Sequence, residues 1–494
     1  MQGHGLANGH CCSGRCNPGG SVLHQAVNGE GEVKFVRLLW VDTSGIRRCR
    51  VVPRCKWEEV CKSGLGLATA AMALQAWADV LAPLSGLTVT GELRLMPQSH
   101  DIRQLPWHPA HAISCGELHE SPGKPSSLCP RAALQRALDA ALDQHGLEFQ
   151  VGFETEFFLL RRDLQASQPP SLTLDGPDVV MQVGQKARRA VPEPVDMLSY
   201  CSSRALDACS QVLDDIMDAL EQLGIPVVQF HAESAPGQFE IVASHGDPFM
   251  AASDLVMTRE TIACIAQRHG LLASFLPKLF KDGCASGCHC HISIIKDGEN
   301  LMNTRGSEHG LSDTAAAFLA GLLHHLPGLM CFTLGSVNSF ERIKPSSWSG
   351  SFQVWGVQNK EATLRLCGHP GVSGSANVEL KALDATANPY VALAAIITAG
   401  LQGITSGARL PPPVNVDPAL LSRQERQDQG ITALPANMGE ALAALKADTA
   451  LVAALEEVLG ADLVKAVRGV RAGENDHFSK ASFEEVVAEV YDRY

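Results

Sequence analysis

VGFETEFFLL, residues 151–160, is the stretch from which the rest of the chain is interpreted. Successive side chains of a β-strand point to opposite faces, so Glu154 and Glu156 share one face, about 6.6 Å apart along the strand. The apolar flanks indicate a buried strand. Two buried like charges repel unless cations neutralise them. From this stretch alone, a pair of metal ligands and an ordinary solvated sheet face are equally well supported.

The composition is typical of a soluble globular protein. The chain has 494 residues, 45% apolar and 19% charged, which is enough for two or more domains. Its net charge of -13 argues against a surface that binds nucleic acid. The longest apolar run, residues 314–334, is interrupted by two histidines and a proline, so no membrane span is predicted. The 16 cysteines lack a repeated spacing and no secretory signal is recognised, which predicts reduced thiols in the cytoplasm.

The first part of the chain predicts a tail followed by a small domain. Residues 1–31 are rich in Gly, Asn, His and Cys, and we expect a disordered tail whose cysteines have no committed role. Residues 32–118 predict an N-terminal domain with a hairpin at 33–53 that turns at Ser44-Gly45, a helix at 57–63 and a strand at 92–97. Asp42 ends the first strand of the hairpin, where capping the turn is the ordinary role of an aspartate.

Residues 119–494 predict a larger second domain. The pattern of apolar residues, glycines and helix caps places helices at 131–145, 204–223, 247–269, 388–404 and in much of 439–494, and strands at 227–242, 287–295, 359–366 and 378–383. The stretch GCHCHISII at 287–295 puts His289, His291 and Ser293 on one face and Cys288 and Cys290 on the other. Because the cysteines and histidines face opposite ways and no C-x-x-C pair is present, a tetrahedral zinc site is not favoured.

Further acids and one histidine occur in strand or strand-edge contexts, namely Glu233, Glu240, His289 and Glu379. Together with the first two glutamates they form a set of five carboxylates and one imidazole, which suits two hard divalent cations such as Mg²⁺ or Mn²⁺. Two cations would bring the site near neutrality and let it accept a nucleoside triphosphate. The cations available to neutralise phosphate or carboxylate groups are Arg342, Lys360, Arg365 and Lys381. Each residue taken singly is more often structural, and spacing alone does not assemble the set.

Several sequence motifs, in the same order as in a known family, bring this set of residues together. They are GFETEFFL, HAESAPGQFEI, ASGCHCHISI, NSFERIKP, WGVQNKEATLRL and VELKALDATANPYVALAAI. On these motifs the chain, from about residue 33 to 494, resembles the glutamine synthetase family. WVDTSGIRRCRVVP and the SWSG stretch resemble its nodulin-like and FluG-like branch, whose extra amidohydrolase-like domain has no room here. The resemblance implies an α+β fold, with a small β-grasp N-terminal domain and a large catalytic domain built on a curled antiparallel sheet with flanking helices.

The resemblance also implies roles for individual residues. Glu156, Glu233 and Glu240 match the ligands of one metal, and Glu154, His289 and Glu379 match those of the other. The positions expected to face ATP are His291, Ser293, Lys360 and Arg365, and those expected to hold the glutamate substrate are Arg342, Lys381 and Ala285. Asp42 matches an acid that helps to hold ammonium in a neighbouring subunit, and with Arg342 and Arg365 it completes the expected catalytic set. The family implies ring-shaped homo-oligomers, decamers or dodecamers.

The chain departs from the family pattern at several positions. Lys360 and Lys381 stand where arginines are usual, Asn377 replaces an arginine, and Cys284-Ala285 replaces an Asn-Gly pair. The glutamate of the flap, which draws a proton from ammonium in the family, is replaced by Trp348. A tryptophan suits an organic amine with an apolar body, because its ring attracts a cation. It is equally expected as a buried side chain that only props the flap shut.

The implied activity is ATP-dependent ligation of L-glutamate with ammonia or an organic amine through a γ-glutamyl phosphate, using ATP and two Mg²⁺ or Mn²⁺ ions in each site. The products are glutamine or a γ-glutamyl amide, ADP and phosphate. A catalytically weak or silent ring that acts as a scaffold is the main alternative. A metallohydrolase that needs no ATP is a third, for which the sequence offers no motif. The nitrogen donor and the ring size stay open.

Overall fold

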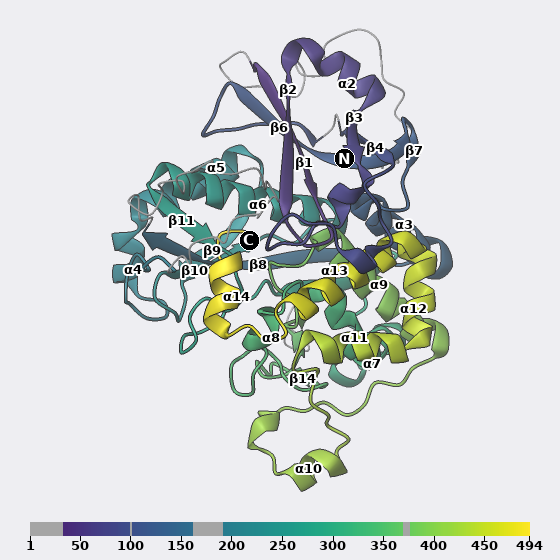
Figure 1. The fold of residues 1–494 in the computed structure, drawn as a ribbon. Coiled ribbons are helices and arrows are strands. Elements are labelled where there is room, and N and C mark those ends of the chain that lie inside the picture. The colour runs from purple at the N-terminus through teal and green to yellow at the C-terminus, as the bar shows by residue number, and fades with distance from the viewer. Residues whose placement is uncertain (1–32, 99–100, 162–190, 369–375) are drawn as a thin grey trace, which may run out of the picture.

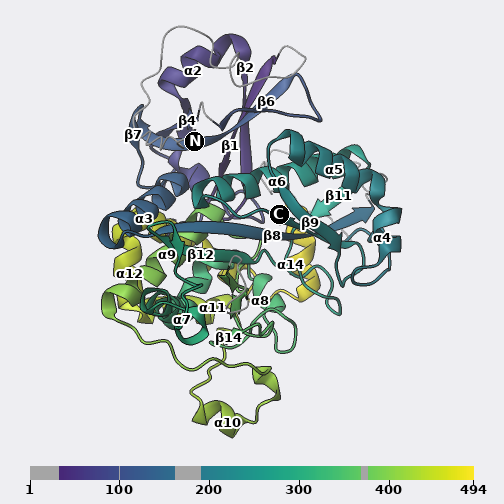
Figure 2. The same cartoon turned by 180° about the vertical axis from the view of Figure 1, so that it is seen from behind.

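The computed structural model describes residues 33–98, 101–161, 191–368 and 376–494, so the predicted tail at 1–31 lies outside the described residues. Figures 1 and 2 show a small N-terminal sheet at one end of the molecule and the segment that carries α10 at the opposite end. A larger sheet, with the C-terminal helices packed beside it, lies between them. The predicted α+β class, with a small N-terminal domain and a large domain on a curled sheet, is confirmed.

The N-terminal sheet is organised around the predicted hairpin. Strand β1 pairs antiparallel with β2 across the turn and parallel with β6 on its other edge. The helix at 57–63 is present as α2, where it was predicted. The order β2-β1-β6-β4-β3 is formed by β1 (Phe35–Val41), β2 (Arg47–Pro53), β3 (Leu65–Ala68), β4 (Glu92–Pro97) and β6 (His111–Ser121), with short β5 (Arg103–Gln104) and β7 (Lys124–Pro125) on β6.

The stretch that opened the sequence analysis lies in β8 (Glu148–Arg161), which runs through the middle of the larger sheet. The first half of β8 pairs with β12 and the second half with β10, both antiparallel. The order is β14-β15-β16-β12-β8-β10-β9. Its members are β9 (Val227–Ala232), β10 (Gln238–Ala243), β12 (Cys290–Lys296), β14 (Trp355–Val357), β15 (Leu364–Cys367) and β16 (Asn377–Leu380), with β11 (Leu271–Ser274) on β8 and β13 (Glu299–Asn300) on β12.

Local capping chemistry explains where the main helices begin and end. Asp247 accepts the N–H of Met250 in front of Pro248, and Asn388 accepts two N–H groups at the start of α9. Four predicted elements needed correction. The helix predicted at 204–223 is interrupted at Cys209, and the strand predicted at 359–366 is reduced to β15 because residues 359–363 are not in a strand. The strand predicted at 287–295 begins only at Cys290, as β12, and the strand predicted at 378–383 ends at Leu380, as β16. The helices of the second domain are α3 (Pro130–His145), α4 (Ser203–Ala208), α5 (Ser210–Gln222), α6 (Pro248–Arg268), α7 (Asp313–Thr333), α8 (Ser339–Arg342), α9 (Pro389–Ser406), α10 (Arg423–Asp428), α11 (Met438–Ala447), α12 (Thr449–Leu455), α13 (Ala461–His477) and α14 (Phe483–Val490).

Helices α7 and α9 form the centre of the hydrophobic core. Both are long and apolar enough to cross a membrane, but most of each is buried inside the protein, as in the core helices of soluble proteins. They approach closely where Gly321 meets Gly403: a Cβ built on Gly403 would lie 2.2 Å from the carbonyl oxygen of Ala317 and 2.5 Å from the nitrogen of Gly321. Backbone atoms cannot move aside as a flexible side chain can, so this contact depends on both glycines.

Gly403→Ala is therefore expected to destabilise the protein by about 1–3 kcal/mol through overpacking, although alanine in an ordinary helix position stabilises by about 1 kcal/mol. Urea unfolding of the purified protein measures the change. Thr405→Ala, an exposed position two residues further along α9, is the matched control and should unfold like the wild type. A Gly403→Ala protein more stable than the wild type would contradict the close packing of α7 on α9.

Candidate active site

The candidate site is a cavity of about 470 Å³ on one face of the larger sheet. Two rows of paired residues cross the strands there. In one row Arg365 of β15 lies opposite Glu379 of β16, which lies opposite His291 of β12. In the other, Glu156 of β8 lies opposite Glu240 of β10. Directly opposed residues of paired strands present their side chains to one face, so the register gathers residues that are far apart in sequence.

Glu154 and Glu156 both line this cavity, and Glu156 is buried, so the pair does not form an ordinary solvated sheet face; their role as metal ligands stays a prediction. The other predicted site residues that line it are Glu233, Glu240, Ala285, His289, Arg342, Lys360, Arg365, Glu379 and Lys381. His291, Ser293 and Asp42 are not in the lining. The Ser293 hydroxyl donates to the carbonyl of Ala376 at 3.0 Å and is buried.

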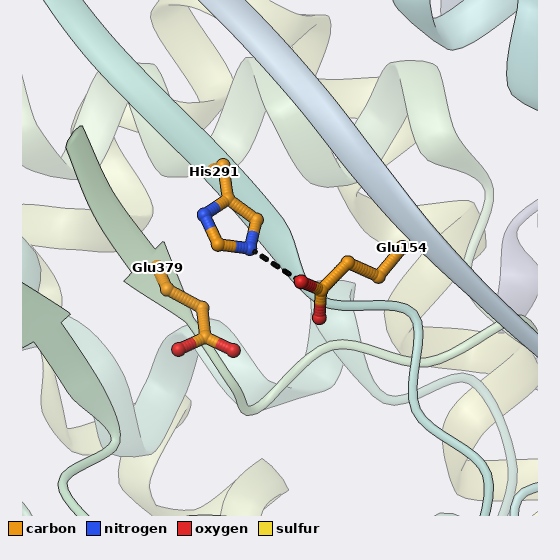
Figure 3. Close-up of side chains that lie close together, drawn as sticks. All are labelled: Glu154, His291 and Glu379. Atoms are coloured by element: carbon orange, nitrogen blue, oxygen red, sulfur yellow. Dashed lines mark hydrogen bonds and ion pairs between the residues drawn. The ribbon is translucent and has the colours of Figure 1, made fainter. Parts of the chain in front are cut away.

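Two groups of side chains are placed to hold a metal ion, and Glu154 belongs to both. In the first, donor atoms of Glu154, His291 and Glu379 lie within 4.8 Å of one another. Figure 3 shows these three side chains close together, from three neighbouring strands. In the second, donor atoms of Glu154, Glu240 and His289 do the same. His289 Nδ1 is 2.8 Å from Glu154 Oε2, and His291 Nε2 is 3.1 Å from Glu154 Oε1.

The buried carboxylates of the cavity can be ionised together only if positive charge lies near them. Burial, together with the surrounding carboxylates, raises the pKa of Glu240 to about 10 and that of Glu156 to about 7. Burial also acts against ionisation of Glu379, but Lys381, His289 and Arg365 outweigh it and lower that pKa to about 2. Carboxylate oxygens and imidazole nitrogens are ligands that Mg²⁺ and Mn²⁺ accept. The residues present therefore fit divalent cations.

The two groups differ from the predicted ligand sets. His291 was expected to face ATP, and the geometry also makes it a candidate ligand. Glu156 and Glu233 line the cavity but belong to neither group; a carboxylate oxygen of Glu233 is 3.2 Å from His231 Nε2. Sequence reasoning missed His231, which also lies 3.8 Å from Glu240 through Nδ1. The available signal was its position two residues before Glu233 in a strand, which puts both side chains on one face.

Three of the predicted cations are held by the protein itself. Arg365 and Lys381 form ion pairs with Glu379, the latter at 2.9 Å. Arg342 is buried, and its guanidinium donates to the carbonyls of Ser286 (3.2 Å), Lys381 (3.1 Å) and Leu383 (2.9 Å). The Arg342 guanidinium thus binds both the loop before β12, at Ser286, and the chain after β16, at Lys381 and Leu383.

Asp42 caps the hairpin turn. Its Oδ1 accepts the N–H groups of Ser44 (2.9 Å) and Ile46 (3.0 Å), and Oδ2 pairs with Arg48. Burial raises the pKa of Asp42 to about 6, although the charge of Arg48 opposes this shift. The contacts are those of the ordinary capping role, and the proposed role towards a neighbouring subunit stays a prediction.

Trp348 lines the cavity and is 55% exposed in the single chain, from which we infer that it lies at the mouth of the cavity; whether it only props the flap shut stays open. The Nζ atom of Lys360 is 5.3 Å from the centre of its ring, within range of a cation–π contact. Lys344, Ser346, Ser347 and Ser349 of the same segment also line the cavity. This segment occupies the place of the predicted flap.

Comparisons with known proteins agree with this fold. Residues 21–125 match the family described as the glutamine synthetase N-terminal domain, and residues 127–490 match the glutamine synthetase catalytic domain. The chain belongs to the glutamine synthetase family, a family of ligases that typically bind ATP and divalent metals. The predicted family is confirmed.

Among individual proteins, the chain is similar to the γ-glutamylpolyamine synthetase GlnA3 of Streptomyces coelicolor, with 34% identity over 92% of this chain and 92% of that protein. It is 30% identical to the type-1 glutamine synthetase 1 of Dictyostelium discoideum over 94% of this chain and 90% of the relative. A solved structure described as a novel glutamine synthase homolog superposes with a TM-score of 0.76 at 28% identity, over 94% of this chain and 100% of the other.

Removing either of two carboxylates should abolish metal-dependent chemistry. Glu154→Ala and Glu379→Ala each delete a candidate metal ligand, and we expect ATP-dependent phosphate release to fall about a thousandfold, with weaker Mn²⁺ binding by calorimetry. Glu299→Ala, an exposed glutamate of β13, is the control. Wild-type turnover by Glu379→Ala at limiting Mg²⁺ would show that Glu379 is not a ligand.

The capping role of Asp42 has its own test. Asp42→Ala removes the acceptor of the Ser44 and Ile46 N–H groups and of Arg48 Nε, while Arg48 keeps its ion pair with Asp79, so the free energy of unfolding should fall by about 1–3 kcal/mol. Asp42→Asn keeps one acceptor oxygen and should lose less. Denaturant unfolding measures both. An Asp42→Ala protein of wild-type stability with a raised KM for the nitrogen donor would instead support the role across subunits.

Proposed function

We propose that this protein is an ATP-dependent ligase that joins the side-chain carboxylate of L-glutamate to an organic amine, through a γ-glutamyl phosphate. The observation that carries the proposal is a cavity with intact metal-binding side chains and an exposed tryptophan at its mouth, where the family pattern has an acid. A γ-glutamylpolyamine synthetase among the relatives supports an amine as the nitrogen donor. The proposed protein is a cytoplasmic, ring-shaped homo-oligomer.

In this mechanism the side chains mainly position groups and stabilise charge, which is what phosphoryl transfer requires of a protein. Bound divalent cations would neutralise phosphate charge at the two carboxylate groups around Glu154. Lys360 and Arg365 would bind phosphate oxygens of ATP, and Lys381 the carboxylate of the amino acid. Arg342 already donates four of its five N–H bonds to carbonyls, so it acts mainly by fixing the loop that carries Ala285.

The nitrogen donor determines what the flap must do. Ammonium has to lose a proton before it attacks, and a nearby carboxylate both attracts the cation and accepts the proton. Trp348 does neither, so an organic ammonium ion would give its proton to solvent or to a carboxylate of the cavity lining such as Glu341, while the ring of Trp348 attracts the ammonium ion by about 0.5–2 kcal/mol and covers its alkyl chain. An alkylamine therefore gains contacts here that bare ammonium lacks.

A catalytically weak or silent scaffold is the alternative. The observations in its favour are the missing flap acid and the lysines at positions 360 and 381, which lose the two-pronged contact that arginine makes with phosphate or carboxylate. Calorimetric titration with ATP and Mn²⁺ separates the two proposals, because a scaffold does not need nucleotide. Absence of ATP binding would favour the scaffold.

The amine preference can be tested by competition. With glutamate, ATP and Mg²⁺, and with ammonium, butylamine and putrescine at equal concentrations, the γ-glutamyl amides should dominate the products identified by mass. Trp348→Glu should shift the products towards glutamine, because it restores an acid at the mouth of the cavity. Glutamine as the dominant wild-type product, formed at an ordinary ligase rate, would overturn the amine preference.

A further inference from the structure

We propose that Glu361 determines the amine preference of the site as a positioning residue that holds Trp348 at the mouth of the cavity. Glu361 is not among the residues that line the cavity. It therefore does not replace the missing acid of the flap. Its contacts are with the backbone of the flap. The part of the proposal that concerns the choice of amine rests on the proposed function, whereas the contact between Glu361 and Trp348 does not.

The flap segment has a backbone that needs outside support. Ser346 and Trp348 both have a φ of 54°, in the left-handed region that residues with a Cβ adopt at a cost in free energy. Such a conformation persists where the surrounding structure holds it. Ser346 and Trp348 are separated only by Ser347. Without contacts that hold both residues, we expect the segment to change to a backbone conformation of lower free energy.

Two carboxylates outside the flap supply that support. The N–H of Trp348 donates to Glu361 Oε1 at 2.9 Å, and the hydroxyl of Ser346 donates to Asp417 Oδ2 at 2.8 Å. Each left-handed residue thus has one acidic partner. The bond to Trp348 is the more important for specificity, because it fixes the backbone of the residue whose ring faces the amine.

Glu361 is itself firmly placed. Its N–H donates to Asn359 Oδ1 at 3.0 Å, and the Asn359 amide donates to the carbonyls of Val414 (2.7 Å) and Val416 (2.9 Å). These bonds fix the turn at 359–361 to the segment that also carries Asp417. Trp348 is thereby connected to a part of the chain that lies beyond the cavity.

The same turn also controls the ring. Lys360, directly before Glu361, places its Nζ atom 5.3 Å from the centre of the Trp348 ring. The backbone of Trp348 is thus held by Glu361 and its side chain is contacted by Lys360. Because the ring is half-exposed, loss of the Glu361 carboxylate should let Trp348 leave the mouth of the cavity.

The first experiment measures the position of Trp348 without substrate. Acrylamide quenching is recorded for the wild type, Glu361→Ala and Glu361→Gln, each corrected with the same protein carrying Trp348→Phe. We expect the quenching of Trp348 to change in Glu361→Ala and to stay near wild type in Glu361→Gln, whose amide oxygen can still accept the N–H. Glu299→Ala is the control, and unchanged quenching in Glu361→Ala would overturn the proposal.

The second experiment measures specificity. In Glu361→Ala the KM for butylamine should rise about twofold to thirtyfold relative to ammonium, the range of a lost cation–π contact, while turnover at saturating butylamine stays near wild type. Glu361→Gln should restore the KM. A changed quenching with an unchanged ratio of KM values would overturn the role in specificity. Failure of the wild type to form any amide would overturn the proposed function, and the quenching result would still show whether Glu361 holds Trp348.

Discussion

Carboxylates gathered on one face of the larger sheet repel one another, and the chain itself supplies only part of the positive charge that would balance them. Glu379 has charged partners within the chain, Arg365 and Lys381. Among the described residues, Glu240 has no lysine or arginine within ion-pair distance, and its pKa is raised to about 10 by burial and by its acidic neighbours. A protein that keeps these groups charged near neutral pH needs cations from outside. The proposed metal ions would therefore let the site carry its charge, as well as take part in its chemistry.

Alternation within one strand made part of this site predictable. Gly152, Glu154 and Glu156 could be placed on one face from residues 151–160 alone, and the strand is where it was predicted. The glycine leaves the position opposite His291 without a side chain. Helices α6 and α9 were predictable for a similar reason, because an Asp-Pro and an Asn-Pro pair mark their starts locally.

What the sequence could not provide was register between distant strands. Arg365, Glu379 and His291 form one row only because β15, β16 and β12 pair with particular offsets, and a slip of one residue would turn each side chain to the opposite face. The resemblance to a family supplied the list of residues, but not the place of His291 in a possible metal group. Glu361 was missed because its carboxylate accepts a backbone N–H of the flap. A contact to the backbone does not depend on the side chain at that position, so the sequence of the flap does not indicate it.

The position of Glu361 has a consequence for how such a site changes its specificity. If the flap were a free loop, exchanging one side chain at position 348 would be enough to replace an acid by an aromatic ring. Here the N–H of Trp348 and the hydroxyl of Ser346 are bound by carboxylates from outside the cavity. An aromatic ring discriminates between amines only if it is kept in one place, since ordering a mobile side chain costs binding free energy. In the proposed enzyme, specificity thus requires two elements: a ring that the amine would contact and a carboxylate, remote from the amine, that holds the backbone of the residue carrying the ring.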